Sequence, residues 1–240
     1  MYAYLELSSI LLGIWALVYV ARASVRRKML VVSAWTSLLG LTEPIFVPAS
    51  WHPPTLFDLA ERTGFDLESL LFAFSAGGLA SALYDVLIGL PTAPIRGHER
   101  LALHHRWHRW ALLCPVPVFI LLYALTSLNA IHISNLALLA GGCATLACRP
   151  DLWRRMAASA GFFVALYVVY FVPLMATHPG YVQAVWNFPA LSGVLVFGIP
   201  LEELLFADAF GWMWSSVYEH LAWTREIDLG AGRVYSGPQV

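Results

Sequence analysis

The chain has few charged residues, three cysteines and a single lysine, and each shortage excludes a class of protein. Charged residues make up 12% of the 240 residues and hydrophobic ones 59%, whereas soluble domains average roughly 25% charged residues. This composition predicts one all-α integral membrane domain over residues 1–240. The net charge of −1 gives no argument for a nucleic-acid partner, so we expect none.

Sites for common cofactors are also missing. The three cysteines, Cys114, Cys143 and Cys148, lack the paired spacing of a disulfide framework or a zinc site. The chain has no glycine-rich dinucleotide fingerprint and no aspartate-rich pair suited to Mg²⁺-diphosphate. The only lysine, Lys28, is expected in a loop, which excludes a retinal Schiff base in the last helix. We therefore expect no cofactor.

A group of histidines alternates with basic and aromatic residues between residues 98 and 110. It comprises His98, His104, His105 and His108. Imidazoles bind iron and zinc, but membrane di-iron oxygenases gather many histidines on one side, and three of the eight here fall elsewhere. The pattern favours a basic segment at the membrane interface, and we predict no metal site.

Seven apolar stretches have the length or composition of membrane spans, which need about 20 residues. They are Tyr4–Val20, Met29–Val47, Leu67–Leu90, Trp110–Leu128, Ile133–Ala147, Met156–Ala176 and Leu201–Trp223. Residues 181–199 are also apolar, but prolines and glycines interrupt them. We interpret this stretch as a re-entrant connection and leave an eighth span as the alternative.

Basic residues test this count. With seven spans, 13 of the 14 lysines and arginines fall on one side of the membrane, and Arg62 alone falls on the other. The positive-inside rule then predicts a cell-membrane protein with its N-terminus outside and its C-terminus in the cytoplasm.

One acidic phrase occurs twice, 134 residues apart. Residues 67–73, Leu-Glu-Ser-Leu-Leu-Phe-Ala, return at 201–207 as Leu-Glu-Glu-Leu-Leu-Phe-Ala, and the match continues to Asp85 and Glu219. The match predicts two three-helix repeats, residues 1–90 and 131–223, joined by a connector loop and helix at 91–130 and followed by a cytoplasmic tail at 224–240. Because the offset is four spans, the copies are parallel and related by a two-fold axis along the membrane normal.

This topology places the repeated acids at two depths. Glu68 and Glu202 are expected to face each other near the outer leaflet, and Asp85 and Glu219 lie about 25 Å deeper at 1.5 Å per residue. Five carboxylates would share the outer level: Glu43, Glu68, Glu202, Glu203 and Asp208. An acid in apolar surroundings tends to stay protonated and can act as a general acid. The alternative is that these acids only begin helices, cap kinks or support packing.

Aromatic residues accompany these acids. Phe72 and Phe206 follow Glu68 and Glu202 by four residues, on the same helix face, and Trp51 and Trp186 precede the two acidic helices. Ring faces stabilise cations, so an acid beside them suits a reaction that creates a carbocation. Plain helix packing is the alternative.

The stretch Pro200-Leu201-Glu202-Glu203, followed by Leu-Leu-Phe, resembles the P-x-E-[E/D] motif of the membrane-integral lycopene cyclase family. The duplicated unit and the Trp-x-x-Pro connection resemble it too. The similarity covers nearly all of residues 1–223, in the fused arrangement of that family. The first copy departs from the motif: it has Asp66-Leu67-Glu68-Ser69, without the proline or the second acid.

The resemblance implies an intramolecular lyase, or isomerase, that cyclises the ψ end group of a lycopene-type carotenoid without a cofactor. It implies Glu202 as proton donor, Glu203 as the group that tunes it or takes the final proton, and Glu68 as the counterpart acid. Asp208, Phe72, Phe206, Trp186, Trp51 and Glu43 would line the substrate site. Membrane lipid, phytoene synthase and other carotenoid enzymes are the candidate partners.

Two other classes stay open. One is a non-catalytic membrane protein that binds or transports carotenoids, with its acids in a structural hydrogen-bond network. The other is a different intramembrane enzyme acting on isoprenoids, such as a hydratase or a hydroxylase.

Overall fold

Helices dominate the structure, a computed structural model that describes residues 3–227. Within that range, five helical segments are long and apolar enough to cross a membrane: Ala3–Ala21, Ala23–Phe46, Leu67–Leu87, Ala130–Cys148 and Pro150–Thr177. The predicted helical, multi-pass class is confirmed at this level, with five rather than seven segments meeting both criteria. Most of the predicted tail, from residue 228 on, lies outside the described residues.

The first half of the chain forms two continuous helices and one interrupted helix. Its elements are α1 (Ala3–Ala21), α2 (Arg26–Thr36), α3 (Glu43–Phe46), α4 (Leu59–Thr63), α5 (Leu67–Leu87) and β1 (Thr92–Pro94). A 3₁₀ turn, Ser37–Thr42, joins α2 to α3. The segment ends where Val47 becomes extended, because a residue before proline avoids the helical conformation.

The predicted single span Trp110–Leu128 is divided in two. α6 (His108–Leu113) ends before α7 (Pro115–Leu125) begins. Pro115 and Pro117 lack the N–H groups that would continue a helix from α6, whereas proline is well tolerated in the first turn of a new one. Neither piece has the length of a span on its own.

The second half repeats the order of long helices. Its elements are α8 (Ala130–Cys148), α9 (Trp153–Thr177), α10 (Tyr181–Val185), β2 (Leu195–Val196), β3 (Ile199–Pro200), α11 (Leu201–Ala222) and β4 (Thr224–Glu226). α8 is longer than the predicted Ile133–Ala147, because Asn129 Oδ1 accepts the N–H of Ile131 at 3.1 Å and caps the helix start. α11 has the length of a span but carries four carboxylates, which explains its absence from the apolar set.

Residues 181–199 do not cross a membrane. They form the five-residue α10, a 3₁₀ turn and the short antiparallel β2–β3 hairpin, none of which approaches the roughly 30 Å of a bilayer core. The prediction of a connection rather than an eighth span is therefore confirmed.

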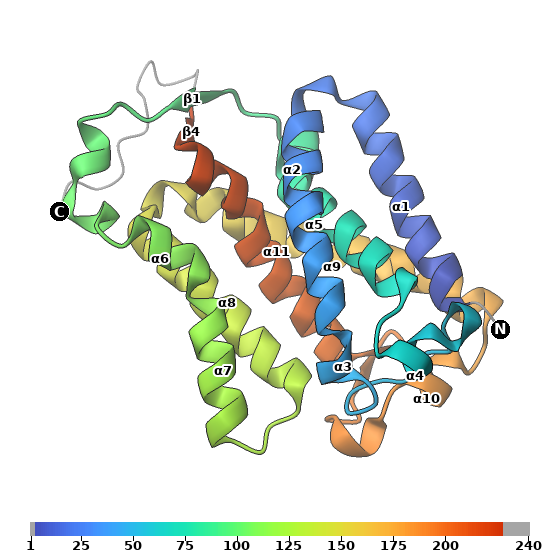
Figure 1. Ribbon diagram of the computed structural model, residues 1–240. Helices are drawn as coiled ribbons and strands as arrows, with labels where there is room; N and C mark the ends of the chain where they lie inside the picture. Colours follow the sequence, from blue (N-terminus) through green and yellow to red (C-terminus); the bar gives the residue numbers. More distant parts are fainter. Residues whose placement is uncertain (1–2, 228–240) are drawn as a thin grey trace.

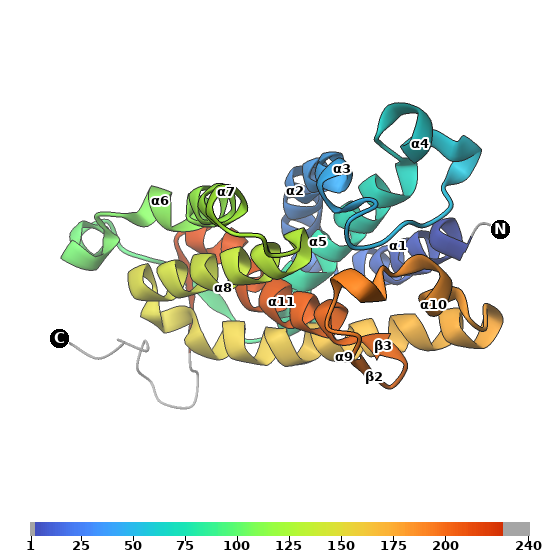
Figure 2. The ribbon, with the colours of Figure 1, turned by 90° about the horizontal axis from the view of Figure 1, so that it is seen from below.

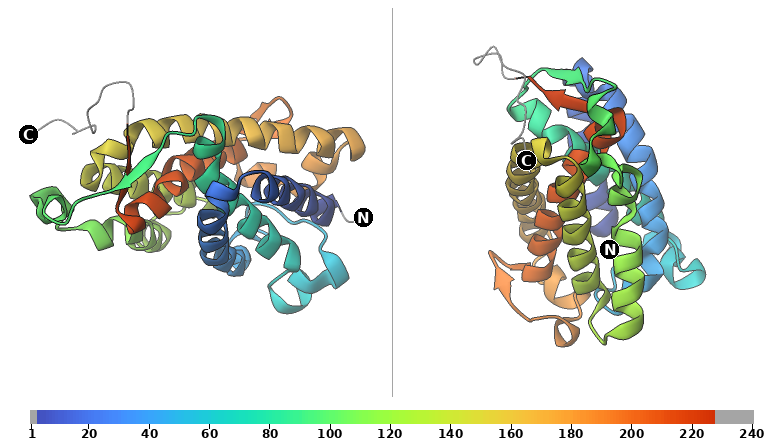
Figure 3. Two further views of the ribbon diagram at one scale, coloured as in Figure 1. Left: turned by 90° about the horizontal axis from the view of Figure 1, so that it is seen from above. Right: turned by 90° about the vertical axis from the view of Figure 1, so that its left-hand side faces the viewer.

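α5 and α11 lie side by side at the centre of the bundle (Figure 1). α5 packs against α1 and α2, and α11 packs against α8 and α9. α9 runs along one face of the molecule, opposite α7 and α3 (Figure 2). β1 pairs with β4 at one end of the bundle, and the β2–β3 hairpin lies at the other (Figure 3).

Two glycines permit close helix contacts that are filled by tryptophan. A Cβ at Gly78 on α5 would overlap the Trp15 indole of α1, and a Cβ at Gly142 on α8 would overlap the Trp212 indole of α11. Trp15 and Gly142 each stand twelve residues after the first residue of their helix. In the α1–α5 pair the tryptophan lies on α1 and the glycine on α5. In the α8–α11 pair the glycine lies on α8 and the tryptophan on α11.

Three buried charged residues and the partly buried Asp85 close a ring at the β1–β4 end. Lys28 of α2 contacts both Asp85 of α5 and Glu219 of α11. Arg155 of α9 contacts the same two acids, at 2.6 Å and 3.2 Å. Lys28 and Arg155 were predicted to lie in loops, and that placement was wrong: both lie in helices and are buried.

Replacing Lys28 tests the ring. The variant Lys28→Met leaves both carboxylates facing Arg155 alone, and breaking a buried ion pair costs about 3–5 kcal/mol. We expect a loss of that size in unfolding free energy, measured by denaturation in detergent. Its neighbour Arg27 is exposed, so Arg27→Met is the matched control and should change stability by less than about 0.5 kcal/mol. Equal losses in the two variants would contradict the ring's importance.

Candidate active site

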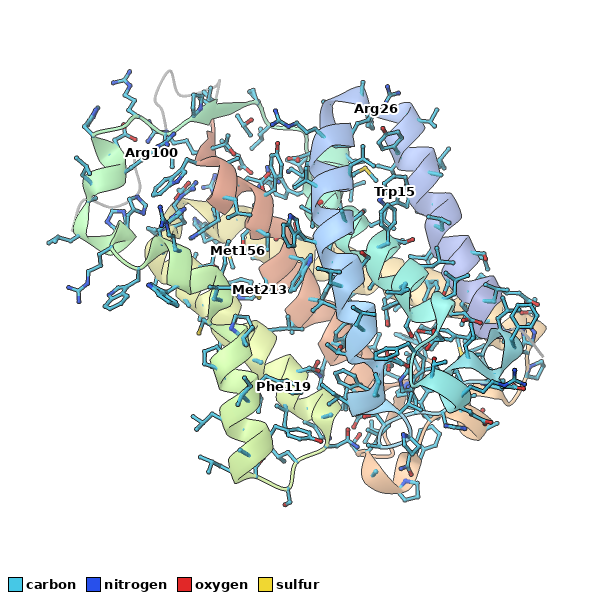
Figure 4. All side chains as sticks on the ribbon, in the orientation of Figure 1. Trp15, Arg26, Arg100, Phe119, Met156 and Met213 are labelled. Carbon is cyan, nitrogen blue, oxygen red and sulfur yellow. The ribbon has the colours of Figure 1, made fainter. Side chains whose placement is uncertain are left out.

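An apolar cavity of about 450 Å³ lies between the two groups of helices, at the end opposite the charged ring. Every described α-helix except α4 contributes to its wall: α1, α2, α3, α5, α6, α7, α8, α9, α10 and α11. Phe119 of α7 and Met213 of α11, both labelled in Figure 4, belong to this wall. A cavity with a few polar groups in an apolar wall is the usual form of a small-molecule site.

One side of the cavity is bordered by residues that are also exposed on the outer surface. Leu39 of the 3₁₀ turn and Val116 and Ile120 of α7 line the cavity and are 43%, 56% and 61% exposed. All three are apolar, and Leu39 belongs to the candidate span Ala23–Phe46. The cavity is therefore bordered by apolar outer surface between α7 and the turn.

Two carboxyl groups line the cavity. Glu203 accepts hydrogen bonds from Tyr167 Oη and Trp186 Nε1, each at 3.0 Å. Glu43 is 7% exposed, and its Oε1 has no hydrogen-bond partner among the described residues. The two acids differ in what surrounds them: both oxygens of Glu203 receive a donor, whereas one oxygen of Glu43 receives none.

Glu68 and Glu202 do not line the cavity. Each is 1% exposed and directs an oxygen to a backbone N–H in the connection before its own helix. Glu68 Oε1 accepts from Leu56 N at 2.7 Å, and Glu202 Oε1 accepts from Ser192 N at 2.7 Å. Each carboxyl group thus satisfies a backbone N–H that would otherwise lack a partner, so these two acids fix the connections to the helices.

The two connections also meet each other. Trp51 and Trp186 form an antiparallel bridge, in which His52 N donates to Val185 O and Asn187 N donates to Ser50 O, both at 2.9 Å. Both tryptophan rings line the cavity. The paired connections thus close the cavity at this end of the bundle.

A polar group from the first half supports the cavity wall. Asp66 caps α5 by accepting from Ser69 N at 2.6 Å and Ser69 Oγ at 3.0 Å. Burial raises the pKa of the Asp66 carboxyl, and these two bonds oppose that rise. The Ser69 hydroxyl also pairs with Tyr4 Oη at 2.9 Å. Both Tyr4 and Ser69 line the cavity.

Aromatic rings form most of the remaining wall near Glu203. The ring of Tyr167 lies 6.3 Å from that of Phe72 and 6.5 Å from that of Phe206. Tyr170 and Phe171 extend this cluster along α9. The α9 rings were not predicted from the sequence, although Tyr167, Tyr170 and Phe171 have the i, i+3, i+4 spacing of one helix face.

The predicted site residues thus separate into two groups. The following six line the cavity: Glu203, Glu43, Phe72, Phe206, Trp51 and Trp186. The other three, Glu68, Glu202 and Asp208, lie outside it, and Asp208 is exposed on α11. The roles of all nine residues stay predictions.

The cavity can hold an apolar molecule. It provides two carboxyl groups and ring faces that stabilise positive charge. Its apolar lining suits a lipid-soluble ligand. Neither carboxyl group has a basic side chain among the hydrogen-bond and ion-pair partners that residues 3–227 provide.

Comparison with known proteins supports the resemblance in the second half. The lycopene cyclase family model matches residues 129–221. The matched segment includes Trp186, Glu202, Glu203 and Phe206. No curated protein and no solved structure matches the chain.

Hydrogen exchange tests the role of Glu68 in fixing its connection. Glu68→Ala removes the acceptor for Leu56 N–H, and losing one such bond should speed exchange in residues 49–66 by roughly 3- to 10-fold. Glu68→Gln keeps an amide oxygen that can accept the same bond, so it should retain most of the protection. The exposed Glu61 in the same connection supplies the control Glu61→Ala. Unchanged exchange in Glu68→Ala would remove this role.

Proposed function

We propose that the protein is a carotenoid cyclase that converts the ψ end group of a lycopene-type substrate into a ring. The observation that carries this proposal is the pair Glu43 and Glu203 in the wall of an apolar, aromatic cavity bordered by apolar outer surface. The lycopene cyclase match over residues 129–221 supports the same chemistry. The reaction is an isomerisation, so it consumes no oxidant or reductant.

The hydrogen bonds assign different roles to the two carboxyl groups. Two like charges in one apolar cavity disfavour each other, so the pair holds at least one proton. Glu203 receives donors on both oxygens, which stabilises its ionised form. Glu43, like Glu68 and Glu202, has one oxygen without a partner among the described residues, but of these three acids Glu43 alone lines the cavity, where that oxygen can carry the proton of a neutral acid. Glu43 is therefore the proton donor and Glu203 the base.

The proton then moves through a balanced cycle. Glu43 protonates the terminal double bond, and the resulting cation is attacked by a second double bond, which closes the ring. The tertiary ring cation lies among the faces of Phe72, Phe206 and Tyr167, and ring faces stabilise such charge. Loss of a proton to Glu203 forms the product double bond. Return of that proton to Glu43 restores the starting state.

This assignment changes the donor inferred from the resemblance. Glu202 was the expected donor, but its carboxylate accepts Ser192 N–H and is absent from the cavity wall. Glu203 keeps the expected role of taking the final proton. Glu202 and Glu68 act as supports that hold the two connections over the cavity.

We also infer that the fold is a duplicated three-helix unit in a fused cyclase. The equivalent residues Ser69 and Glu203 both line the cavity, as do Phe72 and Phe206. Glu68 and Glu202 make the same type of bond to their connections. The pseudo-two-fold axis would pass between α5 and α11. Only the second copy supplies a carboxylate at the Ser69/Glu203 position.

The ends of the bundle support the predicted orientation. Arg26 begins α2 and Arg100 lies in the 3₁₀ turn Glu99–Leu101, yet both lie toward the same end (Figure 4). Glu43 and the paired connections lie at the opposite end (Figure 1). By the positive-inside rule, the end with Arg26 and Arg100 is cytoplasmic and the cavity lies toward the outer leaflet. Other enzymes of carotenoid synthesis that share the membrane are the candidate partners.

Expression in a lycopene-accumulating cell tests the function. We expect cyclic carotenoids to replace part of the lycopene, identified by chromatography and mass spectrometry with no change in mass. A product of altered mass would instead indicate a hydratase or hydroxylase. Unchanged lycopene that copurifies with the protein would favour a carotenoid-binding protein.

Variants of the acids test the assignment in the same cells. Glu43→Gln and Glu203→Gln should each lower the cyclisation rate at least about 100-fold, the usual size of a general acid–base contribution. Glu202→Gln keeps an oxygen for Ser192 N–H and should lower the rate less than about 10-fold. The control is Asp208→Asn, at an exposed position of the same helix.

Each variant is compared at equal amounts of folded protein, measured by size-exclusion chromatography in detergent. Full activity in Glu43→Gln together with none in Glu202→Gln would return the donor role to Glu202.

A further inference from the structure

A second cluster of reactive side chains lies at the β1–β4 end, away from the cavity. It contains His105, His108 and Cys148, whose ligand atoms all lie within 4.8 Å of one another. His105 ends a 3₁₀ turn, His108 begins α6, and Cys148 is the last residue of α8. None of the three lines the cavity.

The spacing of these atoms matches a tetrahedral metal site. Cys148 Sγ lies 3.4 Å from His108 Nδ1 and 3.6 Å from His105 Nδ1. With a zinc–sulfur distance of about 2.3 Å and a zinc–nitrogen distance of about 2.05 Å, tetrahedral angles place the sulfur and nitrogen atoms about 3.5 Å apart. Both observed sulfur–nitrogen distances agree with that value, and all three ligand atoms lie within 4.8 Å of one another, which places them within reach of one ion.

The His108 ring is already oriented for such a role. Its Nε2 donates to the backbone oxygen of His220 at 2.9 Å, which leaves the lone pair of Nδ1 directed at the sulfur. Metal-binding histidines commonly donate their other ring nitrogen in this way. The ring is also stacked between His220 and Trp223, at centroid distances of 3.7 Å and 3.6 Å.

The positive charge of Arg149, next to Cys148 in the chain, is paired with the carboxylate of Asp151. Arg149 follows Cys148 and is fully buried, but both arms of its guanidinium bind Asp151, at 2.8 Å and 2.6 Å. Its remaining contacts are to the backbone oxygens of Glu219 and Thr224. The site therefore does not face an uncompensated positive charge from this residue.

We propose that His105, His108 and Cys148 bind a zinc ion. One thiolate and two imidazoles form a donor set that zinc favours. Three protein ligands leave the fourth tetrahedral position to solvent or to an added ligand. The ion would join residues 103–108 to the end of α8 and, through the His220 carbonyl, to the end of α11. It would stabilise the connector on the opposite side of the molecule from the proposed reaction.

Metal analysis of the full-length protein in detergent tests the site. Protein purified with added Zn²⁺ and then freed of loose metal should retain about one equivalent by mass spectrometry of the element. Replacement by Co²⁺ should produce a thiolate-to-metal charge-transfer absorption. Cys148→Ser and His108→Gln should lower the affinity for Zn²⁺ at least about 10-fold and remove that absorption.

Two matched controls come from the same segments. Cys143 is exposed on α8 and His104 is exposed beside His105, so Cys143→Ser and His104→Gln should bind Zn²⁺ like the unmodified protein. If buried Cys148→Ser does not fold, the half-buried His105→Gln decides the question by the same measurements. Substoichiometric Zn²⁺ in the unmodified protein, or equal loss in a ligand variant and its control, would overturn the site. These readouts are independent of cyclase activity.

Discussion

Four helices are tied together by two positive and two negative side chains, of which Lys28, Arg155 and Glu219 are buried and Asp85 is partly buried. Lys28 and Arg155 each contact both Asp85 and Glu219, and Arg155 also contacts Glu226 of β4 at 3.0 Å, so each of these carboxylates faces a positive charge. The same four helices line the cavity at their other ends. Phe72 of α5, Tyr167 of α9 and Glu203 of α11 belong to its wall. α2 leads into α3, which contributes Glu43. Because a helix is a stiff rod, fixing one end limits how far the other can move. The spacing of the proposed acid and base therefore depends on an electrostatic contact at the far side of the membrane domain.

The membrane class and most helix positions could be predicted from the sequence because they depend on length and hydropathy alone. Which side of each helix faces its neighbours could not be predicted. The long helices are apolar nearly all round, so their sequences do not show which side faces a cavity, a neighbour or lipid. For this reason the roles predicted for Glu202 and Glu203, which are adjacent in the chain, took no account of the directions in which their side chains point. A turn of about 100° per residue separates them, and the structure places one against the Ser192 N–H and the other in the cavity wall.

Contacts between distant segments were the other limit. Lys28 was expected in a loop because basic residues usually mark loop ends, and only tertiary packing brings Asp85 and Glu219 around it. The histidine segment was interpreted as interfacial because its histidines alternate with basic and aromatic residues and three of the eight histidines fall elsewhere. Cys148 reaches it from 40 residues away, at the end of another helix. In both cases the residue type indicated a polar contact, but the contacting residue belongs to another element that is distant in the sequence.

The exchanged tryptophan and glycine contacts bear on how such a chain can diversify. Trp15 fits against Gly78, and Trp212 fits against Gly142. Transferring α1 alone into the place of α8 would set one indole against another, and the reverse transfer would leave a void between two glycines. In the duplication proposed above, a complete set of three helices carries both members of its own pair and avoids either fault. Recombination that moves whole three-helix units is therefore compatible with this bundle. Recombination of single helices would disrupt the helix packing even if every cavity residue were retained.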